Sequence, residues 1–229
     1  MMCDNLRDKE NRLNIGIFGY QETGKTSLIH VWCNEPVNNE YIRTTEMEYS
    51  ELNVTVLDTT IPLTFGDCGF EVVEKFMDSG STALPFLKVM NILIFVFATN
   101  SIDSYNFLEG SPSSVFFNPG ANVEQYVILN MNDLEEKDET KNLVKEHAEQ
   151  NNMPFFVTST KNPDGCKTVL NKIVNSYFEN NPNALEKFKN NPLNKNTKKI
   201  KSQKRKSSKT PQSSHEVNNH NDKKCCTIV

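Results

Sequence analysis

The chain has 229 residues, with 25 Lys or Arg, 29 Asp or Glu and a formal net charge of −4 at pH 7. This length suits one well-cored domain with additional segments. The charge is uneven: residues 187–229 hold 12 basic and two acidic residues, which leaves 13 basic and 27 acidic residues in the remainder. We therefore expect an acidic folded body followed by a basic tail with a role of its own.

Apolar runs and cysteines narrow the class of protein. The longest apolar run, residues 89–98, is interrupted by Asn91 and is too short to span a bilayer, so it predicts a buried central strand. The first residues contain neither a signal-peptide core nor the glycine needed for N-myristoylation. The six cysteines lack the spacing of a disulfide framework or a zinc site. We expect a reducing, cytosolic environment.

Strand and helix patterns alternate along residues 13–180, as is typical of an α/β fold with a mostly parallel sheet and helices on both faces. After a polar N-terminal extension, residues 1–12, we expect six strands, at residues 13–18, 49–56, 61–65, 89–98, 123–129 and 155–158. Helices are expected from residue 27 to about 34, at 71–78, at 106–117 with a break at 110–112, at 139–150 and at 168–178. Residues 181–229 are rich in Asn, Lys and Ser, which predicts a disordered tail.

The segment from Gly19 to Thr26 matches the phosphate-binding loop pattern G-x-x-x-x-G-K-[ST]. It lies between the first expected strand and the first expected helix, where loop N–H groups and a helix N-terminus can surround phosphate oxygens. Lys25 would reach the β- and γ-phosphates, and the Thr26 hydroxyl would hold Mg²⁺. The motif alone also fits ATPases and kinases. Its candidate phosphate-binding residues are Gly19, Gln21, Glu22, Thr23, Gly24, Lys25, Thr26 and Ser27.

Two further motifs resemble those of small GTPases of the Ras/Rab superfamily. Residues 130–133, Asn-Met-Asn-Asp, are similar to the family's N-K-x-D motif, and residues 158–161, Thr-Ser-Thr-Lys, to its T-S-A-K loop. The resemblance implies that Asp133 accepts hydrogen bonds from guanine N1–H and the N2 amine, which adenine does not offer as a pair. It extends over residues 13–180 and implies a P-loop NTPase fold, the G domain, that binds GTP or GDP. The implied guanine-binding residues are Asn130, Met131, Asp133, Ser159, Thr160 and Lys161.

The two switch regions of the family also have counterparts. Residues 41–46 are similar to the first switch, which implies that the Thr44 hydroxyl completes the Mg²⁺ shell and its N–H contacts the γ-phosphate. Gly69 would supply a second N–H to that phosphate, and Asp67 would hold Mg²⁺ through water, so the implied metal set is Thr26, Thr44 and Asp67. The second switch is one residue shorter than the family's D-x-x-G-Q pattern. Either Asp67 is the metal-side acid of a shortened loop, or Gly69 is in register and Gly66 replaces the acid.

Several positions depart from the family, and we assign no catalytic residue. Phe70 or Glu71 stands where the family has the glutamine that positions the attacking water. Gln21 and Glu22 are bulky at loop positions that are small in most relatives, Met131 replaces the lysine of N-K-x-D, and Val37 stands where relatives often stack an aromatic ring on guanine. We expect loose nucleotide binding and slow hydrolysis.

The C-terminus predicts lipid attachment. The last four residues fit the C-a-a-X prenylation signal with Cys226 as the acceptor; Cys225 is then a site for palmitoylation or for a second prenyl group. One lipid gives only marginal membrane binding, and the basic cluster within residues 195–209 supplies a second signal toward anionic lipids. No aromatic residues interleave the lysines, which favours a membrane over nucleic acid. We expect a prenyltransferase as a partner and a position on the cytoplasmic side of a membrane.

Two functions fit these observations. The first is a membrane-attached GTP/GDP switch in signalling or vesicle traffic, whose residues 41–49 and 66–78 recruit effectors. The second is a non-catalytic pseudo-GTPase adaptor that keeps the fold as a binding surface, which Met131, Gln21 and the short second switch support. A P-loop ATPase or kinase, the third reading, conflicts with Asp133. The choice between the Ras and Rab subfamilies stays open.

Overall fold

The computed structural model describes residues 11–38, 40–78, 87, 89–109, 123–134, 138–190 and 227–228. The strands are β1 (Leu13–Phe18), β2 (Glu48–Val56), β3 (Thr59–Asp67), β4 (Ile92–Ala98), β5 (Glu124–Asn130), β6 (Phe155–Val157) and β7 (Thr227–Ile228). The helices are α1 (Lys25–Cys33), α2 (Phe70–Asp78), α3 (Ile102–Glu109), α5 (Asp138–Gln150), α6 (Pro163–Asn180) and α7 (Pro182–Lys189).

All these strands join one sheet in the order β6-β5-β4-β1-β3-β2-β7. Among the described strand pairs, only β2 and β3 run antiparallel. The predicted α/β fold with six mostly parallel strands is confirmed, and the two-residue β7 adds to the free edge of β2. The carboxyl ends of β1, β4 and β5 lie at the same edge of the sheet, because these strands are parallel neighbours.

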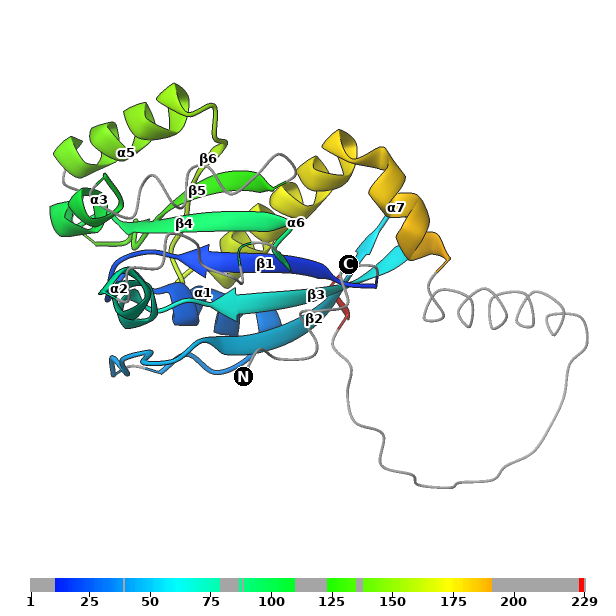
Figure 1. The fold of residues 1–229 in the computed structure, drawn as a ribbon, viewed down its shortest axis with the longest axis horizontal. Helices are drawn as coiled ribbons and strands as arrows, with labels where there is room; N and C mark the ends of the chain where they lie inside the picture. The colour runs from blue at the N-terminus through cyan, green and yellow to red at the C-terminus, as the bar shows by residue number, and fades with distance from the viewer. Residues whose placement is uncertain are drawn as a thin grey trace, which may run out of the picture.

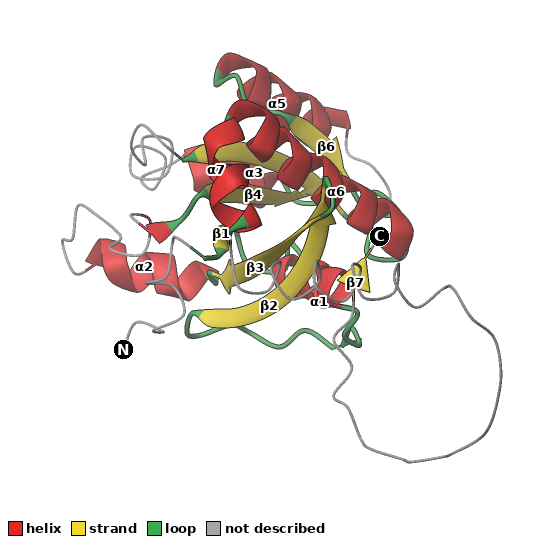
Figure 2. Cartoon of the chain, turned by 90° about the vertical axis from the view of Figure 1, so that its right-hand side faces the viewer, coloured by secondary structure: helices red, strands yellow, loops and turns green. Residues whose placement is uncertain are grey.

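Helices cover both faces of the sheet, and Figure 2 shows α1 and α2 on opposite sides of β2 and β3. Alternate residues of β4 divide between two buried clusters: Ile94 and Val96 pack with α1, α6 and α7, whereas Phe95 and Phe97 pack with α2, α3 and α5. Successive side chains of a strand point to opposite faces, so a strand buried on both faces is apolar throughout. This explains the uninterrupted apolar run of β4, which lies between β5 and β1 in Figure 1.

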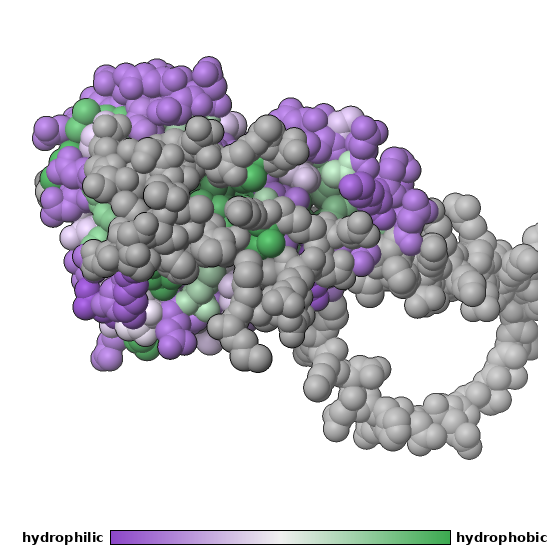
Figure 3. All heavy atoms as spheres, viewed as in Figure 1, coloured by the Kyte–Doolittle hydropathy of each residue, from purple (hydrophilic) through white to green (hydrophobic). Residues whose placement is uncertain are grey.

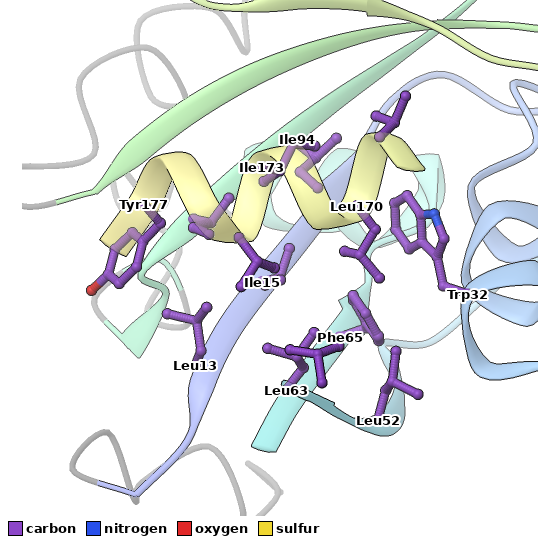
Figure 4. Packing of buried hydrophobic residues seen from close by; sticks show 14 of the residues in the cluster. Leu13, Ile15, Trp32, Leu52, Leu63, Phe65, Ile94, Leu170, Ile173 and Tyr177 are labelled. Carbon is purple, nitrogen blue, oxygen red and sulfur yellow. The ribbon is translucent and has the colours of Figure 1, made fainter. Parts of the chain in front are cut away.

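The cluster on the α6 face joins residues far apart in the sequence. Leu170 and Ile173 of α6 lie over Ile15 of β1 in Figure 4. The Trp32 side chain is completely buried; its Nε1 donates to the Cys166 carbonyl oxygen at 3.0 Å, and its ring centroid lies 5.4 Å from that of Phe65. These contacts hold α1, and with it the preceding loop, in a fixed position on the sheet.

Three helices depart from the predicted pattern. Helix α3 begins at Ile102, four residues before the start expected at residue 106. Helix α6 begins five residues earlier than expected, because Asn162 caps it by accepting the Gly165 N–H at 3.1 Å and Pro163 occupies its first turn. Residues 182–189, assigned from the sequence to a disordered tail, instead form α7. Leu185 and Phe188 of α7 are buried, and the ring of Phe188 lies 5.7 Å from that of Phe178.

The outer surface over α5 and α7 is mainly hydrophilic (Figure 3).

Other predictions fall outside the described residues. They include the second half of the helix expected at 106–117, the basic cluster at 195–209, and both candidate lipidation sites, Cys225 and Cys226. Of the helices that the structure describes, none has the length and apolar character needed to cross a membrane.

Candidate functional site

The phosphate loop connects β1 to α1 and packs tightly at both of its glycines. Gly24, immediately before α1, has φ 81°, and a Cβ there would lie 2.5 Å from Nδ2 of Asn130. A Cβ on Gly19 would lie 2.2 Å from the carbonyl oxygen of Val96 in β4. Glycine is therefore required at both positions by close approach, and at Gly24 also by its left-handed backbone. The loop is held against the carboxyl ends of β4 and β5.

Lys25 is buried at the start of α1. Its Nζ donates to the carbonyl oxygen of Tyr20 at 2.7 Å, and this same carbonyl accepts the buried Thr23 hydroxyl at 3.0 Å. Burial lowers the pKa of Lys25, while the nearby charge of Asp67 acts in the opposite direction. Phosphate oxygens of a bound nucleotide would offer this ammonium group anionic partners inside the loop.

Three oxygen-bearing side chains from separate segments meet beside Lys25. The Thr26 hydroxyl donates to Oδ2 of Asp67 at 2.5 Å, and its oxygen lies 3.3 Å from the Thr44 hydroxyl oxygen. Asp67 is 3% exposed, and its Oδ1 is buried without a hydrogen-bond partner among the described residues. Burial raises the pKa of Asp67, opposed by the Thr26 hydrogen bond and the charge of Lys25.

This oxygen-only donor set fits Mg²⁺, a hard cation that prefers carboxylate, hydroxyl and phosphate oxygens. Thr26 and Thr44 would hold the ion through their hydroxyl oxygens, and Asp67 through its unpartnered oxygen or an intervening water. When bound, Mg²⁺ supplies positive charge that neutralises the phosphates of the nucleotide.

The register of β3 distinguishes the two alternatives for the acid. Asp67 pairs with Ile17 of β1, and Gly66 pairs with Gly16. Because neighbouring strand residues face opposite sides, Asp67 points to the face covered by α1, whereas a Cβ on Gly66 would meet Met47 and Met90 on the other face. Asp67, and not Gly66, therefore lies beside Thr26.

Gly69 lies against the first switch. A Cβ added to Gly69 would be 2.3 Å from the carbonyl oxygen of Thr44. This approach leaves no room for a side chain, so the two switch segments contact each other through their backbones. Thr44, Asp67 and Gly69 are thus brought together with Thr26 of the phosphate loop.

Asn130 ties the phosphate loop to the two segments that resemble guanine-binding motifs. Its Nδ2 donates to the Thr23 carbonyl oxygen at 3.0 Å, and its Oδ1 accepts the Thr158 hydroxyl at 3.0 Å. Asn130 and Thr158 are both buried. The three segments are consequently connected through one side chain.

Asp133, three residues after Asn130, is exposed to solvent. One of its carboxylate oxygens accepts the Ser159 hydroxyl, and the other lies 2.7 Å from Lys161 Nζ. Hydrogen bonds from Lys161 and Ser159 lower the pKa of Asp133. The half-buried Thr160 lies between these two partners in the chain. An ionised carboxylate at this position is an acceptor-only group, suited to a ligand with two adjacent donors.

A cavity of about 440 Å³ opens beside the phosphate loop, within the range of ordinary ligand sites. Six predicted site residues line it: Glu22, Gly24, Lys25, Thr26, Ser27 and Met131. Tyr41 and Ile42, from the segment similar to the first switch, also line it. Five further lining residues were not predicted from the sequence: His30, Asn38, Glu40, Asn100 and Ser101. Asn100 and Ser101 follow β4 after Thr99. The rule that ligand-binding loops follow the carboxyl ends of parallel strands could have found them.

Three aromatic rings fill the space beside the second switch. The Tyr20 centroid lies 5.0 Å from that of Phe70 and 5.5 Å from that of Phe107, and the Phe70 and Phe107 centroids are 4.9 Å apart. Phe70, directly after Gly69, is therefore packed between the phosphate loop and α3. Its ring offers no amide or carboxylate that could orient a water molecule.

Comparison with known proteins agrees with this geometry. The family model of the Ras family matches residues 14–179. The chain is 23% identical over 188 residues to the Ypt/Rab-type GTPase YPT7 of Saccharomyces cerevisiae, covering 79% of this chain and 88% of that protein. It is 26% identical over 183 residues to the Ras-related protein Rab-7b of Bos taurus, covering 79% and 89% of the two chains. The chain belongs to the Ras family, as a divergent GTP-binding switch of the Ras/Rab superfamily.

Proposed function

We propose that this chain is a membrane-attached GTP/GDP switch that binds nucleotide with Mg²⁺, cleaves GTP slowly and acts in signalling or vesicle traffic. The observation that carries the proposal is the meeting of Thr26, Thr44 and Asp67 beside the buried Lys25. These residues come from the phosphate loop and both switch segments, so nucleotide with its metal would connect all three. Similarity to two Rab-type proteins favours vesicle traffic.

The switching action follows from contacts that depend on the γ-phosphate. Backbone N–H groups of Thr44 and Gly69 would bind this phosphate, and the close approach of the two residues lets one ligand order both segments. Loss of the phosphate would release residues 41–49 and 66–78 together. Effector proteins would then distinguish the two states through these residues.

Slow hydrolysis is supported by the packing of Phe70. GTP cleavage needs an oriented water and neutralised phosphate charge, while the protein does little covalent chemistry. Phe70 follows Gly69 and is held by Tyr20 and Phe107. This position therefore contributes no group that aligns the water.

Nucleotide binding and turnover test the proposal on purified protein. A fluorescent GDP analogue should bind with Mg²⁺ and be released when EDTA removes the ion. In a single turnover, GTP should be cleaved more slowly than by typical small GTPases, and Phe70→Gln should raise the rate about tenfold or more by restoring an amide. Cleavage by the unmodified protein at ordinary rates without a partner would contradict slow hydrolysis.

A pseudo-GTPase adaptor is the second candidate, favoured by the state of Asp133. Both of its carboxylate oxygens already have a partner, Ser159 and Lys161, and guanine would have to compete with these partners. Met131, in the cavity wall, also replaces the family's lysine. An adaptor would show no Mg²⁺-dependent affinity for guanine nucleotides in the same titration, and competition by ATP would expose an adenine-specific site.

The membrane part of the proposal rests on the sequence of the tail. Incubation with a prenyltransferase and a prenyl donor should add mass at Cys226, alone or together with Cys225, and Cys226→Ser should abolish the addition at that residue. The lipidated protein should bind vesicles with anionic lipids better than neutral vesicles, and this difference should shrink with added salt. Equal binding to both kinds of vesicle would exclude the basic cluster as the second signal.

A further inference from the structure

Arg43 lies where the phosphate loop meets both switch segments. Its Nε is 2.7 Å from Oε1 of Glu71, in the first turn of α2, and its Nη2 donates to Oε1 of Gln21 at 3.3 Å. The Glu71 side chain is only 19% exposed, so part of this ion pair is shielded from water. One guanidinium group thus connects three segments of the candidate nucleotide site.

The neighbours of Arg43 in the chain place it close to the phosphate end of the site. Ile42 lines the cavity, and the hydroxyl oxygen of Thr44 is 3.3 Å from that of Thr26. Gln21, which accepts from the guanidinium, belongs to the phosphate loop. The guanidinium group of Arg43 is therefore held between two segments that would surround the γ-phosphate.

The charges around the cavity favour recruitment of another cation. Its described wall contains the carboxylates of Glu22 and Glu40 and the ammonium group of Lys25. A nucleoside triphosphate adds several negative charges to this site. Its terminal phosphate would compete with Glu71 for Arg43, because a guanidinium binds phosphate through two parallel hydrogen bonds.

We propose that Arg43 is a catalytic residue supplied by the chain itself, which leaves Glu71 and contacts the γ-phosphate oxygens when GTP binds. This inference rests on the proposed function. In the reaction, a water oxygen forms a bond to the γ-phosphorus while the bond to the β–γ bridging oxygen breaks. The bridging oxygen keeps the electron pair in GDP, and the proton of the water passes to the released phosphate. Arg43 forms no covalent bond and neutralises the charge of the transition state, as an arginine in cis does in other GTPases.

Substitutions on both sides of the ion pair test this role. With protein preloaded with GTP, Arg43→Ala should slow single-turnover cleavage about tenfold or more, and Arg43→Lys should not restore it, since lysine lacks the planar fork. Glu71→Ala should raise the rate, because it removes the competitor for Arg43 and introduces no amide beside the attacking water. If the ion pair had only a structural role, loss of Arg43 and loss of the Glu71 carboxylate would change the cleavage rate in the same direction. Arg12→Ala is the matched control: it removes the comparable pair of Arg12 with Glu51, at 2.8 Å, and should leave the rate unchanged.

A transition-state mimic gives a second readout. The unmodified protein with GDP should bind aluminium fluoride without a partner protein, detected by a fluorescent GDP analogue, and Arg43→Ala should lose this response while still binding GDP. Equal cleavage rates for Arg43→Ala and the unmodified protein, or an intact fluoride response in the variant, would overturn the inference. Absence of nucleotide binding by the unmodified protein would instead refute the proposed function.

Discussion

Replacement of Asn130 by Ala should destabilise the domain even without nucleotide. Asn130 is 1% exposed, and its side chain makes two 3.0 Å hydrogen bonds, to the carbonyl of Thr23 and from the hydroxyl of Thr158. The substitution leaves both buried partners unpaired, at about 1–3 kcal/mol each. The expected loss is about 2–6 kcal/mol, a large part of the roughly 5–15 kcal/mol that stabilises a typical domain.

Urea unfolding of nucleotide-free protein measures this loss. Trp32 is the single tryptophan of the chain and is completely buried, so its emission should report the unfolding of the α1 and α6 packing. Asn151→Ala is the matched control, because the exposed Asn151 makes a local hydrogen bond to the His147 carbonyl oxygen and should cost less than about 1 kcal/mol. A loss below about 1 kcal/mol for Asn130→Ala would refute the view that this side chain ties the segments together.

Three more predictions follow from local geometry. Gly69→Ala should reduce the preference for GTP over GDP measured by nucleotide competition. The added Cβ would lie 2.3 Å from the carbonyl oxygen of Thr44 and would separate the two switch segments. An unchanged preference would argue against the backbone contact between these segments. Phe188→Ala should lower the free energy of unfolding by about 3–5 kcal/mol, because the buried Phe188 ring packs α7 against the domain. A loss under about 1 kcal/mol would mean that α7 is not part of the folded domain. Burial raises the pKa of the Cys33 thiol from 9.0 to about 12, so this thiol stays protonated at pH 9. Iodoacetamide should therefore label Cys33 much more slowly in native than in urea-unfolded protein, and peptide mass analysis would measure the difference. Equal labelling in the two states would contradict this shift.

Much of the site could be predicted from sequence, because its chemistry lies in short continuous motifs. The strand, phosphate loop and helix that contain Lys25 and Thr26 are adjacent in the chain, and their geometry follows from glycine conformation and helix initiation. Asn130 and Asp133 could be recognised in the same way, since Asn130 ends the apolar strand β5 and Asp133 comes three residues later. In the structure Asn130 contacts the phosphate loop at Thr23, and Asp133 contacts Ser159 and Lys161.

Contacts between distant segments could not be predicted in this way. The choice between Asp67 and Gly66 depends on the register of β3 against β1, since a shift by one residue would exchange their faces. Likewise, the pair of Leu185 and Phe188 stabilises α7 only because Phe178 and the rest of the core lie beneath it.

The sequence by itself determined the fold class, the phosphate loop and the candidate for guanine selectivity, because each depends on residues close together in the chain. Only the tertiary structure decided which acid lies beside Thr26, that Phe70 packs between Tyr20 and Phe107, and that Arg43 joins Glu71 and Gln21. These contacts require sheet register and helix packing, which are settled by burial summed over the whole domain rather than by any local pattern.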